Sequence, residues 1–430
     1  GGLTVDDRLT IMSAETDDMS LDKTNWLLTV VKKDTFNVLS NRLNVNSNGF
    51  VYLGADTTDA YPTGGDANLE QVIGAGEVRI KVSGSILNAA NTSGSVIQGH
   101  KAILEAASGS IGTALKPVTL TLTGGGTPSQ ATLVARAQDG VWLSQTGDMR
   151  VADVYSPASV SLTASGAIID ARGERTRSIE ADGITLTALG GAVGTELNPM
   201  RVKSSLSSGV NASSALGYSI YLHGAETGLT VGNLSSGLDL DLYSAQGGLR
   251  VVGDATALGR IDAEASGTGD FTMSSGTTLR AQTGDIYVSA DDVGLSQLDA
   301  SRGVVVVARG SLTDTSDDAV NVNVAGRGVT LTAAGSIGTT SKAVDVLAKT
   351  GTKLVATTGG NAYLGSATSS LRALVMRACA RANVLAIETC AVRASTPGSV
   401  KPEWGRCRIG VSAPSCGSMT SKGRSSHFGC

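Results

Sequence analysis

Short segments in which apolar and polar residues alternate run along most of the chain. In "GVTLTAAGSIG", which starts at Gly328, aliphatic and hydroxyl side chains alternate. Successive side chains of a strand point to opposite faces, so Val329 and Leu331 are expected inside and Thr330 and Thr332 outside. Similar segments start at Ser159, Gly183 and, more loosely, Lys101. The pattern predicts many short strands separated by glycine turns, and no convincing amphipathic helix.

A glycine-containing phrase follows three of these strands. It reads "ASGSIGTALKPV" at residues 107–118, "LGGAVGTELNPM" at 189–200 and "AAGSIGTTSKAV" at 333–344. Glycine adopts positive φ readily, so Gly335 is expected to turn a corner, after which Ile337 returns to the interior. We interpret the phrase as a corner that the chain has to make repeatedly, and not as a site.

A second phrase places one aromatic residue between aliphatic residues. It occurs as "FVYLGAD", "GVWLSQTGD", "SIYLHGAETG", "GDIYVSADDVG" and "GNAYLGSAT", centred on Tyr52, Trp142, Tyr221, Tyr287 and Tyr363. Successive aromatics lie 90, 79, 66 and 76 residues apart. The spacing indicates repeated units of irregular length. We favour a shape-filling role for these aromatics over a platform on which sugar rings stack.

These repeats favour an all-β parallel β-solenoid with glycine-rich corners over residues 1–370. A sandwich is normally complete in about 100 residues, and propeller blades of about 40–50 residues carry signatures of their own. Solenoid coils of about 20 residues would give some 18 coils, and a rise of about 4.8 Å per coil predicts a rod of about 85 Å.

Composition supports this interpretation. The chain of 430 residues has 55 glycines and only 3% aromatic residues, yet its hydrophobic content of 41% is ordinary for a soluble protein. The first residues, "GGLTVDDRLTIMSAE", show no signal peptide, and we expect the sequence to be an interior fragment of a longer protein. No apolar run is long enough to span a membrane.

The tail at residues 371–430 differs from the rest in every statistic. It holds all five cysteines and nine Lys or Arg against two acidic residues, a net charge of +7, which leaves −11 for residues 1–370. Its cysteines contain no C-x-x-C pair, which argues against a zinc site. Three interpretations stay open: a frameshifted reading, a cap for the solenoid and a distinct small domain. We expect the tail to be mostly disordered or out of frame.

The repeat region, roughly residues 50–369, resembles that of large exported bacterial adhesins of the filamentous haemagglutinin type. The strands "GDIYVSA" and "FVYLGAD" and the phrase "GVTLTAAGSIGT" carry the resemblance. It implies a long right-handed β-helix, export through an outer-membrane transporter, an extracellular or cell-surface location, and a role in adhesion or biofilm formation. The receptor, whether on a host cell, in matrix or a glycan, is not implied.

Few residues suggest chemistry. Acidic groups occur in turns at Asp56, Asp59, Asp66, Asp291, Asp292, Asp314, Asp317 and Asp318. We interpret them mainly as solvated turns, with calcium binding a minor alternative and catalysis a smaller one, since Asp favours turns. The three histidines, His100, His223 and His427, look isolated and are expected to be exposed or in turns.

No residue is therefore assigned as catalytic, cofactor-binding or metal-binding, and no cofactor is expected. Nucleic-acid binding is improbable for a body with a net charge of −11. Two functions remain: a structural and adhesive rod with no enzymatic activity, and a polysaccharide-active β-helix enzyme as the alternative.

Overall fold

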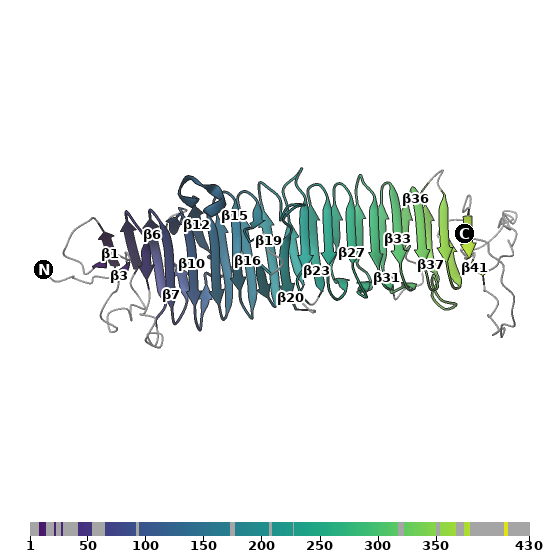
Figure 1. The fold of residues 1–430 in the computed structure, drawn as a ribbon, viewed down its shortest axis with the longest axis horizontal. Coiled ribbons are helices and arrows are strands. Elements are labelled where there is room, and N and C mark those ends of the chain that lie inside the picture. The colour runs from purple at the N-terminus through teal and green to yellow at the C-terminus, as the bar shows by residue number, and fades with distance from the viewer. Residues whose placement is uncertain are drawn as a thin grey trace, which may run out of the picture.

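Stacked coils of short parallel strands make up the computed structural model of this protein (Figure 1). The structure describes residues 42–53, 65–91, 94–172, 177–205, 209–226, 228–316, 322–349 and 353–366, and five further strands at residues 8–13, 21–22, 27–28, 374–378 and 408–411. Within these residues the fold is all-β, with no α-helix and two 3-10 turns at Gly124–Gly126 and Pro128–Gln130. The predicted parallel β-solenoid is confirmed.

Two sheets form the walls of the rod. Sheet I has 23 strands, which are β1 (Arg8–Ser13), β4 (Arg42–Ser47), β6 (Ala67–Gly74), β8 (Ile86–Asn88), β9 (Ile97–Gly99), β11 (Ser110–Ile111), β12 (Val118–Leu122), β14 (Gly140–Gln145), β16 (Ser159–Ala164), β19 (Gly183–Ala188), β21 (Val210–Ser213), β23 (Leu229–Ser236), β25 (Leu249–Val251), β26 (Ala255–Ala257), β28 (Phe271–Met273), β29 (Thr278–Ala281), β31 (Val293–Leu295), β32 (Gln297–Ala300), β34 (Leu312–Asp314), β35 (Val324–Gly326), β37 (Val344–Ala348), β39 (Ala362–Ser366) and β41 (Arg408–Val411).

Sheet II carries the longer outward face. Its 16 strands are β5 (Val51–Leu53), β7 (Glu77–Val82), β10 (Lys101–Ala106), β13 (Thr132–Ala137), β15 (Met149–Tyr155), β17 (Ile168–Asp170), β18 (Ile179–Ala181), β20 (Met200–Ser204), β22 (Ile220–Gly224), β24 (Leu240–Ser244), β27 (Ile261–Ala265), β30 (Ile286–Ala290), β33 (Gly303–Ala308), β36 (Gly328–Ala333), β38 (Leu354–Thr358) and β40 (Leu374–Ala378). A separate antiparallel pair joins β2 (Leu21–Asp22) to β3 (Leu27–Leu28).

Each central coil contributes two short strands to sheet I and one to sheet II. The coil of β25, β26 and β27 stacks on the coil of β28, β29 and β30, strand for strand. The stack has about 13 turns, not the 18 expected. Coil length is the reason, because register partners in adjacent coils lie from 18 residues apart, as for Ile286 and Val304, to 31 apart, as for Ala102 and Leu133. At about 4.8 Å per turn the rod is about 60 Å long.

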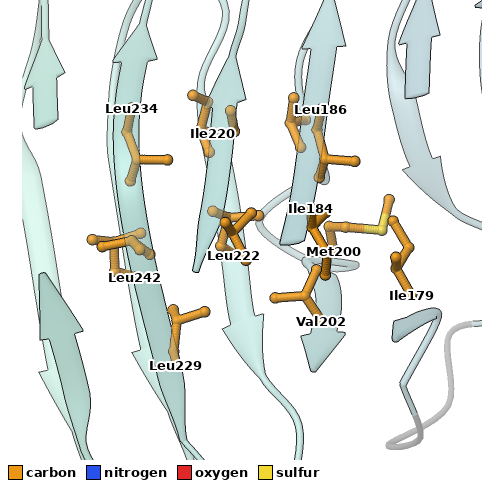
Figure 2. Close-up of a cluster of buried hydrophobic side chains, with 14 of the residues drawn as sticks. Ile179, Ile184, Leu186, Met200, Val202, Ile220, Leu222, Leu229, Leu234 and Leu242 are labelled. Carbon is orange, nitrogen blue, oxygen red and sulfur yellow. The ribbon is translucent and has the colours of Figure 1, made fainter. Parts of the chain in front are cut away.

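The interior is a single apolar column between the sheets. Figure 2 shows Met200 and Leu222 of sheet II among Ile184 and Leu186 of sheet I, all fully buried. Small residues close the corners, since the alanines that end β10 and β13 are register partners, as are those that end β33 and β36. The predicted register is confirmed: Val329, Leu331 and Ile337 are buried, and Thr330 and Thr332 are half-buried on the outside.

The repeated glycine phrase is more than a corner. Ile337 and Val344 pair with Ala362 and Leu364, so residues seven apart in one coil face residues two apart in the next. Residues 338–343 therefore loop out of the strand. The other two copies do the same at residues 112–117 and 194–199. We call these three segments the excursion loops.

A glycine with positive φ opens each excursion loop. The φ angles are 70° at Gly112, 69° at Gly194 and 67° at Gly338. Gly335, where positive φ was expected, does not have it. Its lack of a side chain serves close stacking instead, because a Cβ at Gly335 would lie 3.0 Å from the Gly310 carbonyl oxygen of the preceding coil.

The aromatic phrase supplies the floor beneath each excursion loop. A Cβ at Gly194 would lie 2.6 Å from the Tyr221 carbonyl oxygen, and one at Gly338 would lie 2.5 Å from that of Tyr363. The backbone N–H groups of Tyr221 and Tyr363 donate to the carbonyls of Val193 and Ile337. The glycine phrase and the aromatic phrase therefore recur together because they stack on each other in adjacent coils.

Each excursion loop closes on a threonine. The backbone N–H groups of Lys116, Asn198 and Lys342 donate to the Oγ1 atoms of Thr113, Thr195 and Thr339, each at 3.0 Å. The preceding coil anchors the loops from the other side: Asn88 Nδ2 donates to Pro117 O at 2.8 Å, and Asn198 Nδ2 to Asp170 O at 3.3 Å. Three consecutive coils thus form one structural unit.

Two strands lie within the tail at residues 371–430. β40 continues sheet II, with Leu374 in register with Leu354. β41 pairs antiparallel with β39, so it covers one edge of sheet I that a further coil would otherwise extend. Strand stacking therefore does not end at the composition boundary near residue 370. The five cysteines lie outside the described residues.

The register of β36 gives a matched pair of variants. Leu331→Asp would place an unpaired carboxylate in the apolar column and should lower the free energy of unfolding by several kcal/mol. Thr330→Asp, on the outside of the same strand, should leave the melting temperature nearly unchanged. Thermal unfolding followed by circular dichroism measures both, and equal melting temperatures would show that the assigned register is wrong.

Replacement of glycines tests the stacking of the excursion loops. Gly338→Ala should destabilise the protein for two reasons, positive φ and the overlap with Tyr363 O. Gly276 also has positive φ, 82°, but has open space around it, so Gly276→Ala should carry only the backbone cost of about 1–2 kcal/mol. A melting temperature for Gly338→Ala at or above that of Gly276→Ala would contradict the stacking.

Candidate functional site

The outward face of sheet II divides into bands of different chemistry. In its amino-terminal band, charges pair across coils. Lys101 Nζ lies 2.6 Å from Glu77 Oε2, and Lys203 Nζ lies 3.1 Å from Glu180 Oε1. Near the carboxyl end the same outward positions hold Val305, Thr330 and Val355, which carry no charge.

Between these bands lies a strip of acidic and aromatic side chains on β22, β24, β27 and β30. We call it the acidic strip. Parallel register arranges it in two columns along the rod. The first column is Tyr221, Asp241, Asp262 and Tyr287, and the second is His223, Tyr243 and Glu264.

Contacts hold the second column in place. The rings of His223 and Tyr243 have centroids 4.8 Å apart and are tilted by 48°. The Tyr243 hydroxyl lies 3.3 Å from Ser266 Oγ and donates to it. His223 Nε2 lies 3.9 Å from Asp241 Oδ1 of the first column. The strip is open to solvent, with Tyr287 37% exposed.

Carboxylates in the strip stack on each other instead of on cations. Asp241 and Asp262 are register partners on neighbouring strands, and Glu264 lies on the same strand as Asp262. In the part of the chain that the structure describes, neither Asp262 nor Glu264 forms an ion pair within 4.0 Å. Like charges that face each other across strands are destabilising. This arrangement contrasts with the paired charges of the amino-terminal band.

Burial and repulsion shift the titration of these groups. Partial burial, and then the charge of Asp262, raise the pKa of Asp241 to about 6. Burial also raises the pKa of Asp262. Burial, and then the charge of Arg201, lower the pKa of His223 to about 4. At neutral pH the strip is therefore anionic, and His223 is a neutral ring that does not offset the carboxylates.

The second excursion loop borders the strip. The charge of Glu196 in this loop contributes to the raised pKa of Asp241, so the loop lies near that carboxylate. Leu197, at the tip, is 94% exposed. Arg201 is engaged elsewhere, because its guanidinium Nη1 lies 3.0 Å from Oδ2 of the fully buried Asp170.

The acidic residues singled out in the sequence have structural roles where they are described. The backbone N–H of Ser85 donates to Asp66 Oδ1 at 2.7 Å, and that of Ser311 to Asp292 Oδ1 at 2.6 Å. Each carboxylate thus caps the start of a strand in the next coil. Asp291 lies 3.7 Å from Arg309 Nε, and Asp314 accepts from Asn323 Nδ2 at 2.7 Å. Asp56, Asp59, Asp317 and Asp318 lie outside the described residues.

The expectation for the histidines is wrong at one position. His223 lies on a strand and contacts Tyr243, so it is neither isolated nor in a turn. His100 follows β9 and is half-buried, and His427 lies outside the described residues. Trp142, Tyr221, Tyr287 and Tyr363 all point outward between buried aliphatic neighbours, so none of them fills the interior.

Sequence reasoning missed Asp241, Asp262 and Glu264. They lie within strands, in "LDLYS" and "IDAEA", where a carboxylate at an outward position looks like an ordinary solvated side chain. The signal that finds them is their register, 21 residues apart on adjacent coils. Within the described residues, no group of three or more His, Cys, Asp or Glu side chains could hold a metal ion.

The opposite pKa shifts predict opposite pH responses for two variants. Asp241, with its raised pKa, stabilises the fold as pH falls from about 6 toward 4, because the folded state then binds a proton more tightly than the unfolded state. His223, with its lowered pKa, costs stability as pH falls from about 6.5 toward 4. The two effects oppose each other in the unchanged protein.

We therefore expect Asp241→Asn to lose more thermal stability than the unchanged protein between about pH 7 and pH 4.5, and His223→Asn to lose less. Melting temperatures at the two pH values give the difference for each protein. An identical change in all three would show that these two groups do not titrate as described.

Comparison with protein-family models, with curated proteins and with solved structures returns no match. No helix among the described residues is long and apolar enough to cross a membrane. The acidic strip and the excursion loops are therefore interpreted from their own geometry.

Proposed function

We propose that this chain is a structural and adhesive rod of a large secreted or surface-attached bacterial protein, which attaches to cells, matrix or biofilm. The observation that carries the proposal is the continuous stack of about 13 turns, whose interior is apolar and whose polar chemistry lies in bands along an outer face. Such a stack creates reach and surface. Extended solenoid surfaces are commonly used for binding.

The resemblance to exported adhesins supports the same proposal. Under it, an outer-membrane transporter is the partner during export, and the working location is the cell surface or the medium. The receptor belongs to a cell, a matrix or a glycan.

Attachment of coated particles tests the adhesive role. Beads that carry the full chain should be retained on bacterial biofilm or on cultured cells well above beads coated with the Leu331→Asp variant, in which the stack is disrupted. Retention is counted under flow after washing. Equal retention of the two kinds of bead would refute the adhesive proposal.

A polysaccharide-active enzyme is the second candidate, and the acidic strip favours it. Glycoside hydrolysis uses two carboxyl groups, one of which keeps its proton near neutral pH. Asp241, with its pKa near 6, stacks on Asp262 and lies near His223. That pair could supply an acid and a base.

Product formation separates the two candidates. The purified chain should release no reducing ends and no unsaturated products from acidic or neutral polysaccharides if it is a rod without catalysis. Turnover that disappears in Asp241→Asn would instead establish the enzyme. Turnover that persists in this variant would mark a contaminating activity.

A further inference from the structure

We propose that the acidic strip binds a linear cationic amino-sugar polymer, such as partly de-N-acetylated glucosamine chains, laid along the axis of the rod. The inference rests on the proposed adhesive function and names the class of glycan to which the rod would attach. Three features of the strip support it: the spacing of its side chains, its uncompensated charge and its aromatic residues.

Spacing favours a sugar polymer. Asp241 and Asp262 occupy one column on adjacent coils, and coils repeat every ~4.8 Å. This rise is close to the length of one pyranose ring in an extended chain, so successive sugars would meet successive coils. An extended peptide places side chains of one face about 6.6 Å apart, which does not match the coil repeat.

Charge selects an amino sugar. The carboxylates of Asp241, Asp262 and Glu264 lie together without a basic partner among the described residues within 4.0 Å, apart from His223, which is neutral above its pKa of about 4. An ammonium group on each sugar would supply the missing counter-charge and form charge-assisted hydrogen bonds. A neutral glycan would leave the repulsion between the carboxylates in place, and an acidic one would add to it.

Aromatic side chains delimit the strip. Tyr221 and Tyr287 stand at the two ends of the first column, and Tyr243 lies beside Asp241 in the second. Tyrosine faces stack on the apolar faces of sugars and attract ammonium groups. A glycan that covers both carboxylates would therefore contact a ring at each end.

The neighbouring bands set the length of the site. On one side lie Arg201 and Lys203, which would repel a cationic chain, and on the other lies Val305, which carries no charge. The strip between them covers the four strands β22, β24, β27 and β30. It should therefore hold about four sugar units, by the coil repeat of ~4.8 Å.

Calorimetric titration of the full chain near pH 6.5 tests the proposal. The probes are β-linked glucosamine oligomers of about two, four and six units, the fully N-acetylated tetramer, tetralysine and calcium chloride. We expect the glucosamine tetramer to bind, the dimer to bind at least about tenfold more weakly, and the hexamer to gain little over the tetramer. The acetylated tetramer and tetralysine should each bind at least about tenfold more weakly than the glucosamine tetramer.

Variants assign the binding to the strip. Asp262→Asn should weaken tetramer binding at least about tenfold, and Glu264→Gln should weaken it less. Asp139→Asn is the matched control, because it removes the same charge from an exposed corner several coils away and should leave binding unchanged. Melting temperatures confirm that each variant is folded.

Several results would overturn the proposal: no binding of the glucosamine tetramer, equal binding of tetralysine, tight binding of calcium alone, or no effect of Asp262→Asn. The bead assay keeps the two proposals distinguishable. Beads that attach although the chain binds no amino sugar would leave the adhesive function standing and remove this ligand. Oligomer binding without bead attachment would have the opposite meaning.

Discussion

Backbone hydrogen bonding between successive coils is the constraint on which the rest of the structure depends. A strand in the middle of the stack must pair with the strand before it and with the strand after it, so its register is fixed on both sides. The narrow interior then decides each position, because a one-residue slip would move every inward side chain to the outside. Leu331, fully buried, and Thr330, on the outside, differ by a single position. Side-chain chemistry is free to vary only on the outer face.

This constraint explains why bland residues recur. Where coils come together closely, as at Gly335 and Gly310, only glycine fits. Where a strand starts without a partner for its first N–H, an Asp of the preceding coil accepts it, as Asp66 and Asp292 do. An excursion loop is permitted where the coils on both sides hold its base. The glycine phrase and the aromatic phrase are therefore two parts of one arrangement that the chain repeats three times.

The sequence predicted what alternation alone determines. Val329, Leu331 and Ile337 are buried because the period of two is local and strong, and the parallel solenoid followed from its repetition. The number of turns could not be predicted, because nothing in "GSIGTTSKAV" shows that six residues leave the strand. The acidic strip was missed for a related reason. Asp241 and Asp262 meet only through a register that depends on the lengths of all the turns between them.

The acidic strip is costly in a way that the chain demonstrably avoids elsewhere. At Glu77 and Lys101, register partners on adjacent coils carry opposite charges, so the same device could have paired Asp241 with a cation. Instead the strip places Asp262 there, and the pKa of Asp241 rises to about 6. In a solenoid, stability is approximately a sum over neighbouring coils, so repulsion confined to one pair is compensated by the coils on either side. The fold can therefore hold an unfavourable concentration of charge on its surface, and a ligand of opposite charge would relieve it.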